Sequence, residues 1–183
     1  MAGELADLRA ELLSRGAGDE GVRNRLIEAG LGGSLEADAI AAEVEATDRA
    51  NTEWLKEVLE RRGWPLSSEV GLDGAHAAWL LAQHADHDPA FQRRCLDLMA
   101  EAVAAGQAGK SDFAYLTDRV LLAERRPQRY GTQFTQRGNA WEPHELEDPG
   151  RVDQRRAEMG LGPLDEYAET IRKAYGDPPG AQT

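Results

Sequence analysis

The segment from Ser34 to about Arg62 limits the folds open to this chain more than any other stretch. Its apolar residues recur every three or four positions, as they do along one side of an amphipathic helix. Gly63 follows as a stop signal, and Trp64-Pro65 continues as extended chain. The stripe includes Ile40, Val44, Thr47, Asn51, Leu55 and Val58. The segment therefore predicts the longest helix of the protein.

Helical patterns also cover most of the remaining chain. Residues 4–14 and 19–30 are predicted as two short helices, with Gly16 ending the first and Asp19 capping the second. Residues 65–73 are predicted as a loop before the next helix. Further helices are expected over 89–105, 111–125, 149–159 and 164–175.

The segment 128–141 differs from its surroundings, because aromatic and threonine residues flank a turn there. This pattern predicts a small β-hairpin or an ordered loop. The expected architecture is therefore a mainly all-α bundle of about seven helices with this hairpin or loop. With 183 residues and no change in composition, the chain is expected to form a single domain over 1–176, followed by a disordered tail, 177–183.

The charge of the chain argues against several classes of partner. Its formal net charge is −12, whereas nucleic acids and anionic membranes bind clustered Lys and Arg side chains. No run of about 18 apolar residues predicts a membrane span, and the N-terminus lacks a basic segment followed by an apolar core. We expect a cytoplasmic protein whose partner is a small-molecule ligand or another protein.

Three of the four histidines lie in the segment 74–88, GAHAAWLLAQHADHD. Helical geometry places His76, His84 and His87 on one side of it. His84 and His87 have acidic neighbours, but they lack the i, i+4 spacing and the glutamate of a zinc-protease helix, so surface or capping roles are favoured. Sequence signatures of nucleotide-binding loops, CxxC pairs and EF-hands are absent. Neither a metal nor an organic cofactor is expected.

Polar residues interrupt two otherwise apolar helical faces. Asn51 lies on the stripe of the longest helix, one turn after Asp48, and a buried amide without a partner costs about 1–3 kcal/mol. Asn51 therefore either has a structural role, bonded to a neighbouring helix or placed at the surface, or forms a pocket wall. Asp118 and Arg119 lie in the segment 111–125, which is apolar around most of its circumference and predicts a buried helix. They either form ion pairs with other helices or contribute to a ligand pocket.

Several short motifs occur together in this chain. They are Gly63-Trp64-Pro65, Ala78-Trp79-Leu80, Gln83-His84-Ala85-Asp86, Asp118-Arg119-Val120 and Tyr130-Gly131-Thr132-Gln133. This combination resembles a bacterial family of domains of unknown function with QHAD and YGTQ motifs, over roughly residues 19–167. The resemblance brings no established activity. It implies that certain polar residues belong together, namely Asp48, Asn51, Gln83, His84, Asp118, Arg119, Gln128, Tyr130 and Gln133.

His84 is the first candidate catalytic residue in this set, because an imidazole can take up and return a proton near neutral pH. Asp118 is the second, as a carboxylate that would fix the tautomer of the ring and stabilise its charged form. The remaining residues are candidates for binding a substrate: Asp48, Asn51, Gln83, Arg119, Gln128, Tyr130 and Gln133. Directed hydrogen bonds from such side chains hold a carboxylate or polarise a carbonyl.

Three classes of function stay open at this point, and metal-dependent chemistry is the third. The first is a small cofactor-independent enzyme, in a biosynthetic setting, that carries out a hydrolytic, cyclising or eliminating step on a polar small molecule. The second is a non-catalytic binding or immunity-type module that recognises a partner through an acidic helical surface.

Overall fold

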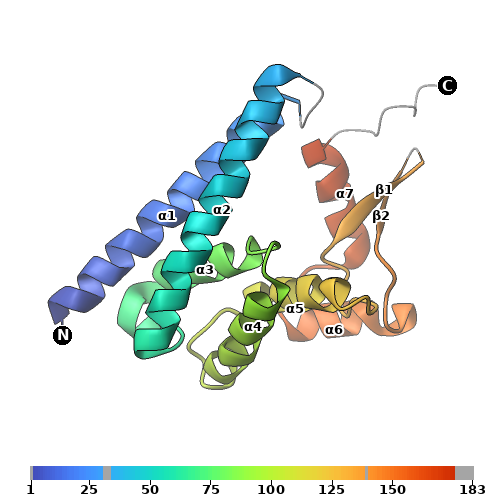
Figure 1. The fold of residues 1–183 in the computed structure, drawn as a ribbon. Helices are drawn as coiled ribbons and strands as arrows, with labels where there is room; N and C mark the ends of the chain where they lie inside the picture. Colours follow the sequence, from blue (N-terminus) through green and yellow to red (C-terminus); the bar gives the residue numbers. More distant parts are fainter. Residues whose placement is uncertain (1, 31–33, 139, 176–183) are drawn as a thin grey trace. The chain divides into compact units, whose positions relative to one another are not determined.

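A computed structural model of the chain describes residues 2–30, 34–138 and 140–175. The contacts divide the chain into two compact units, Met1–Gly109 and Lys110–Thr183, each described here by itself. Helices dominate, and two short strands complete the fold (Figure 1). The predicted mainly all-α fold with a small hairpin is thus confirmed. The prediction of one domain over 1–176 stays a prediction, and the predicted tail 177–183 lies outside the described residues.

The first unit is built from helices. Its described part contains α1 (Ala2–Glu28), α2 (Leu35–Arg62), α3 (Ser67–Gln83) and α4 (Pro89–Ala104). The helices α1 and α2 run side by side, and α3 packs against both of them (Figure 1). Their apolar stripes meet in a core whose most deeply buried side chains include Leu12, Leu55, Val58, Val70, Leu81 and Met99. The predicted amphipathic pattern of α2 is therefore its buried face.

The prediction of two short helices before residue 30 is wrong, because α1 continues through Gly16 and Asp19 without a break. Gly16 is buried, and a Cβ added to it would lie 3.3 Å from the Cβ of Ala77 on α3. The glycine therefore lets two helices approach closely instead of ending one. Tertiary packing outweighs the low helix propensity of glycine at this position.

The connections of α2, α3 and α4 follow local capping chemistry. The side chain of Ser34 accepts a hydrogen bond from the backbone N–H of Ala37 at the start of α2, and Asp88 does the same for Phe91 at the start of α4. The predicted loop 65–73 is only partly correct, because α3 begins at Ser67. Gly71 interrupts it with a φ of 76°, a left-handed value that glycine adopts at little cost.

The second unit combines helices with the hairpin. Its described part contains α5 (Lys110–Ala123), α6 (Val152–Glu158) and α7 (Leu164–Tyr175), with a short 3₁₀ turn over Pro149–Arg151. The strands β1 (Phe134–Arg137) and β2 (Ala140–Pro143) pair antiparallel, with Phe134 opposite Pro143. The hairpin thus occupies the second half of the predicted segment 128–141, and an ordered loop forms the first half.

The described helices carry charged side chains along their length. The first turn of α2, for example, contains the acidic residues Glu36 and Asp38, and its last turn contains the basic residues Arg61 and Arg62. None of the described helices combines the length and the apolar composition needed to cross a membrane.

Candidate functional site

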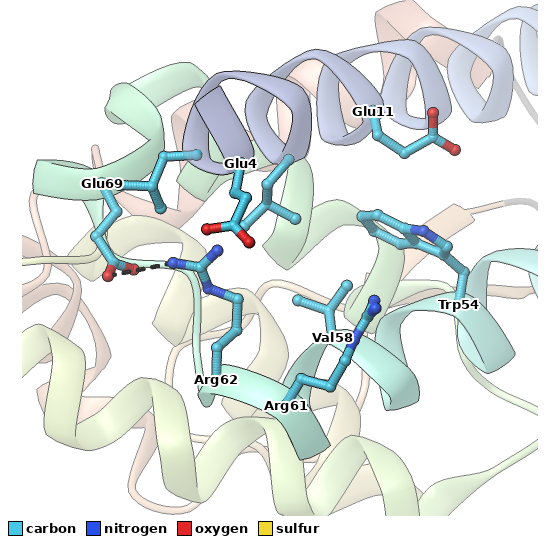
Figure 2. A pocket seen from close by; sticks show the side chains of 9 residues that line it. Glu4, Glu11, Trp54, Val58, Arg61, Arg62 and Glu69 are labelled. Atoms are coloured by element: carbon cyan, nitrogen blue, oxygen red, sulfur yellow. Dashed lines mark hydrogen bonds and ion pairs between the residues drawn. The ribbon is translucent and has the colours of Figure 1, made fainter. Parts of the chain in front are cut away.

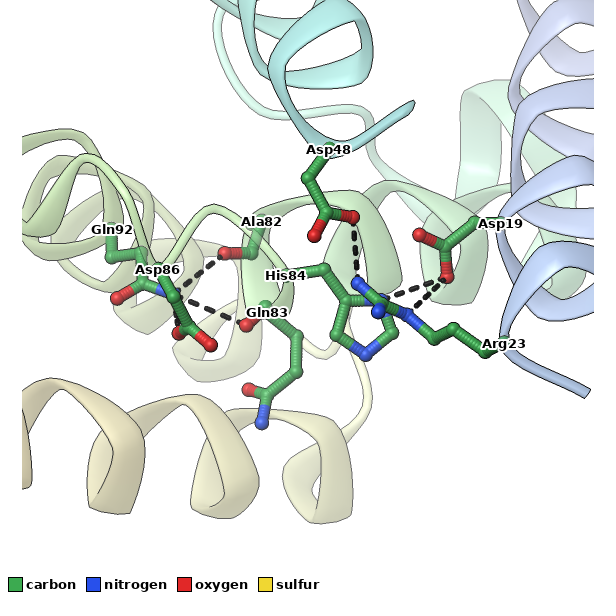
Figure 3. Close-up of polar contacts among 8 residues, drawn as sticks. All are labelled: Asp19, Arg23, Asp48, Ala82, Gln83, His84, Asp86 and Gln92. Atoms are coloured by element: carbon green, nitrogen blue, oxygen red, sulfur yellow. Dashed lines mark hydrogen bonds and ion pairs between the residues drawn. The ribbon is translucent and has the colours of Figure 1, made fainter. Parts of the chain in front are cut away.

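The cluster around His84 joins three helices of the first unit. His84 is the residue that caps the C-terminus of α3, and its side chain is 18 % exposed. Its Nδ1 lies 2.8 Å from Oδ2 of Asp19, which α1 contributes. Asp48 approaches from α2 (Figure 3). One ligand-type atom from each of the three side chains lies within 4.8 Å of the other two.

The guanidinium of Arg23 sits among these three side chains (Figure 3). Its Nη2 donates a hydrogen bond of 2.6 Å to Oδ1 of Asp48. Its Nε lies 3.3 Å from Oδ2 of Asp19 and 3.0 Å from Nδ1 of His84. We refer to Asp19, Arg23, Asp48 and His84 as the three-helix cluster.

Nδ1 of His84 has two polar neighbours with different requirements. Oδ2 of Asp19, at 2.8 Å, accepts a hydrogen bond from a protonated Nδ1, whereas the Nε–H of Arg23, at 3.0 Å, is directed at Nδ1 as an acceptor. The tautomer of the ring decides which of these two contacts Nδ1 makes. The other ring nitrogen, Nε2, points away from both carboxylates (Figure 3). When Nδ1 of the neutral ring carries the hydrogen, Nε2 is the atom that accepts a proton.

The two carboxyl groups of the cluster differ in their pKa values. Burial raises the pKa of Asp19, but the hydrogen bond and charge of His84 and the charge of Arg23 outweigh burial, so the pKa falls below its usual value. Burial raises the pKa of Asp48 above its usual value in spite of the neighbouring Arg23. Asp19 is thus held as the anion, and Asp48 is the carboxyl that takes up a proton more readily.

A cavity of about 320 Å³ opens beside the cluster. Its lining residues are Glu45, Asp48, Arg49, His84, Asp86 and His87. Asp48 and His84 therefore face a space that can admit a small polar molecule, whereas Asp19 lies behind them with a side chain only 1 % exposed.

Asn51 and Gln83 are buried members of the predicted set, and both lie outside this cavity lining. Oδ1 of Asn51 accepts a hydrogen bond of 3.1 Å from Nη1 of Arg15, so this amide joins α2 to α1. The backbone carbonyl of Gln83 accepts a hydrogen bond from Nε2 of Gln92 at 3.1 Å. For Asn51 the structure shows the interhelical contact that was one of the two alternatives.

Asp118 holds a loop of the second unit. Its carboxylate accepts hydrogen bonds from the backbone N–H groups of Arg129, Tyr130 and Thr132, at 2.7 to 3.1 Å, and from the Thr132 hydroxyl at 3.0 Å. Burial raises the pKa of Asp118 although these hydrogen bonds favour the anion. Within the first unit Asp19 contacts the His84 ring, and within the second unit Asp118 binds the backbone of this loop.

Gln128 and Arg156 hold the same loop from other directions. Gln128 donates to the carbonyl oxygens of Gln133 and His144, at 3.0 and 2.9 Å, and accepts a hydrogen bond from the Gln133 backbone. Arg156, only 2 % exposed, donates to the carbonyl of Tyr130 at 2.7 Å. The polar residues around the YGTQ motif thus fix the backbone of their own loop. Arg119 is half-buried on α5.

The sequence predicts that His84 shares a site with Asp118, Arg119, Tyr130 and Gln133. These contacts would join residues of the two units, so they stay predictions. His76 and His87, the other histidines of the 74–88 segment, are both exposed.

A larger cavity of about 570 Å³ lies between α1 and α2 and is drawn in Figure 2. Its apolar lining includes Leu5, Leu8, Trp54 and Val58, and two of its arginine side chains make polar contacts. Arg62 pairs with Glu69 at 3.4 Å, and Nε of Arg61 donates to a backbone carbonyl of its own helix. None of the residues that line this cavity is a histidine.

The sequence of the chain matches one known protein family. Residues 6–178 match the model of DUF6624, described as a family of unknown function. The chain belongs to this family. The predicted membership of an uncharacterised domain family is thereby confirmed. Searches of curated proteins and of solved structures gave no match.

Two residues of the three-helix cluster, Asp19 and Arg23, are not among the site residues predicted from the sequence. Asp19 was predicted to cap a helix, and Arg23 was not considered. The signal available in the sequence was their i, i+4 spacing, which places both on one side of α1. That spacing is common on solvated helices, so the burial of Asp19 is what identifies it.

Proposed function

We propose that this protein is a small enzyme that moves protons on a polar small molecule at the three-helix cluster. The observation that carries the proposal is the contact between Nδ1 of His84 and the buried Asp19, beside a cavity that His84 lines. An imidazole oriented by a carboxylate is a common arrangement for general acid/base catalysis. A hydrolytic, cyclising or eliminating step fits this chemistry.

The individual roles follow from position. His84 would exchange a proton with the substrate through Nε2, because Asp19 occupies Nδ1. Asp19 would be a positioning residue, since it is buried behind the ring. Asp48 lines the cavity with a raised pKa, which suits a group that donates a proton. Arg23 would neutralise charge that develops in the cluster.

We place this enzyme in the bacterial, cytoplasmic and biosynthetic setting that the sequence leads us to expect. The acidic lining from Glu45, Asp48 and Asp86 favours a substrate that carries a hydrogen-bond donor or a positive charge.

The test compares His84→Gln with His76→Gln, a matched control on the same helix whose side chain is exposed. Each protein is incubated with a soluble bacterial metabolite extract, and mass spectrometry identifies the compounds that it consumes. We expect His84→Gln to lower the rate of consumption at least about 100-fold, the usual contribution of general acid/base catalysis. His76→Gln should keep the wild-type rate.

Far-UV circular dichroism and thermal midpoints establish that both variants are folded. Consumption that is equal in wild type and His84→Gln would overturn the proposal. If the wild type consumes no compound, a non-catalytic binding module becomes a better explanation of the cluster than an enzyme.

A further inference from the structure

We propose that Asp19, Asp48 and His84 form a binding site for a divalent transition-metal ion, which takes the place held by the Arg23 guanidinium. The ligand atoms of the three side chains lie within 4.8 Å of one another. Ligand atoms around a bound ion lie about 3–4 Å apart, given metal–ligand distances of about 2.0–2.2 Å. Small side-chain rotations therefore bring all three onto one ion.

The guanidinium already shows that the site attracts a cation. Two carboxylates and an imidazole surround it, with contacts of 2.6 to 3.3 Å. The side chain of Arg23 is 26 % exposed, so it has solvent to move into when an ion enters. The three ligand residues belong to α1, α2 and the end of α3, and this arrangement fixes them without the ion.

The charge of the cluster is not balanced by Arg23 alone. Two carboxylates face one guanidinium, which leaves one negative charge when the His84 ring is neutral. Burying such an excess charge is costly. Either a proton or a second positive charge from a metal ion removes it.

A buried oxygen atom points to the same conclusion independently of the charge count. Oδ1 of Asp19 is inaccessible to solvent and has no hydrogen-bond partner among the described residues. Leaving a buried polar atom without a partner costs about 1–3 kcal/mol. The contacts of this carboxylate with the Arg23 guanidinium and the His84 ring end on its other oxygen, Oδ2 (Figure 3). A metal ion bound by both oxygens of Asp19 would give Oδ1 a partner of the right charge.

The donor set indicates the kind of ion. Two carboxylates with one imidazole suit Mn²⁺, Fe²⁺ or Zn²⁺, whereas Ca²⁺ and Mg²⁺ prefer oxygen donors alone. The adjacent cavity leaves room for water or a ligand to complete the coordination. The spacing of His84 and His87 in the sequence argued against a metal, but the ligands proposed here come from three separate helices.

The experiment titrates Zn²⁺ into the untagged full-length protein by isothermal calorimetry. We expect one ion per wild-type chain, and affinity reduced at least about tenfold, or 1.4 kcal/mol, in both Asp48→Asn and His84→Gln. Arg23→Gln should bind Zn²⁺ at least about tenfold more tightly, because it removes the competing cation. Arg25→Gln is the matched control, since Arg25 lies on the same helix and forms an exposed pair with Glu43.

Circular dichroism confirms that each variant is folded, and Asp48→Asn and His84→Gln provide independent losses of a ligand. The proposal is overturned if neither wild type nor folded Arg23→Gln binds Zn²⁺, or if the binding survives in both ligand variants. It is also overturned if Arg25→Gln raises the affinity as much as Arg23→Gln. The metal site and the proposed enzyme are tested separately. Zn²⁺ binding without metabolite consumption contradicts only the proposed enzyme. Consumption that depends on His84 without Zn²⁺ binding contradicts only the metal site.

Discussion

Asp19 and Asp118 are both fully buried carboxylates, yet their surroundings shift their pKa values in opposite directions. Burial raises both values. Around Asp19 the hydrogen bond and positive charges of His84 and Arg23 outweigh burial, whereas Asp118 meets mainly neutral backbone N–H groups. Neighbouring charge therefore lowers the pKa of Asp19, whereas around Asp118 burial outweighs the hydrogen bonds.

Asp19→Asn is expected to lower the free energy of unfolding by about 2–3 kcal/mol at pH 7, because it removes a charged hydrogen-bond acceptor. The folded pKa of Asp19 lies below the unfolded value near 3.8. Its contribution is therefore present above that value and is lost as the pH falls through the folded pKa. Urea unfolding from pH 7 to pH 3 should show the difference between wild type and variant shrinking below about pH 4.

Asp73→Asn is the matched control for this measurement, because Asp73 pairs with Arg9 on the surface, where both side chains are about half exposed. The control should change the free energy of unfolding by less than about 1 kcal/mol. A loss in Asp19→Asn no larger than in the control, or one that does not shrink between pH 4 and pH 3, would show that Asp19 is not held as an ion by His84 and Arg23.

At the scale of single helices, glycines in α1 separate the effects of propensity and packing. Gly18 is exposed, and a Cβ added there would meet nothing within 4 Å. Gly18→Ala should therefore raise the free energy of unfolding by about 0.5–1 kcal/mol. Gly16→Ala should not give this gain, because its Cβ would press against Ala77 at 3.3 Å. Chemical denaturation of both variants measures the contrast, and an equal gain in both would contradict the close packing of α1 on α3.

The same helix shows which parts of the fold could be predicted from sequence. The amphipathic pattern of α2 is local, and it predicted this helix correctly. Gly16 was misinterpreted because its role depends on Ala77, which is distant in sequence. Local patterns report propensity, whereas the closeness of two helices is a property of their packing.

The candidate site could be predicted only in part for a similar reason. His84 is predicted as part of a sequence motif and Asp48 as a polar residue beside the apolar stripe of α2, and the structure brings the two together. Asp118 was recognised as a buried charge, but nothing in the sequence states whether a buried carboxylate binds a side chain or the backbone of a loop. Arg23 looks like an ordinary surface residue until α2 and α3 are packed beside α1.

At the scale of the whole molecule, the three-helix cluster lies entirely within the first compact unit, Met1–Gly109. A fragment of residues 1–109 is therefore expected to fold and to keep the cluster, because α1, α2, α3 and α4 bury a core of their own. Circular dichroism should show helix, and urea should unfold the fragment cooperatively.

Residues 1–62 are the control, since without α3 the apolar faces of α1 and α2 stay uncovered and cooperative unfolding should be lost. If 1–109 behaves like 1–62, the first unit depends on the rest of the chain, and the sequence-based prediction of one domain over 1–176 is the correct description.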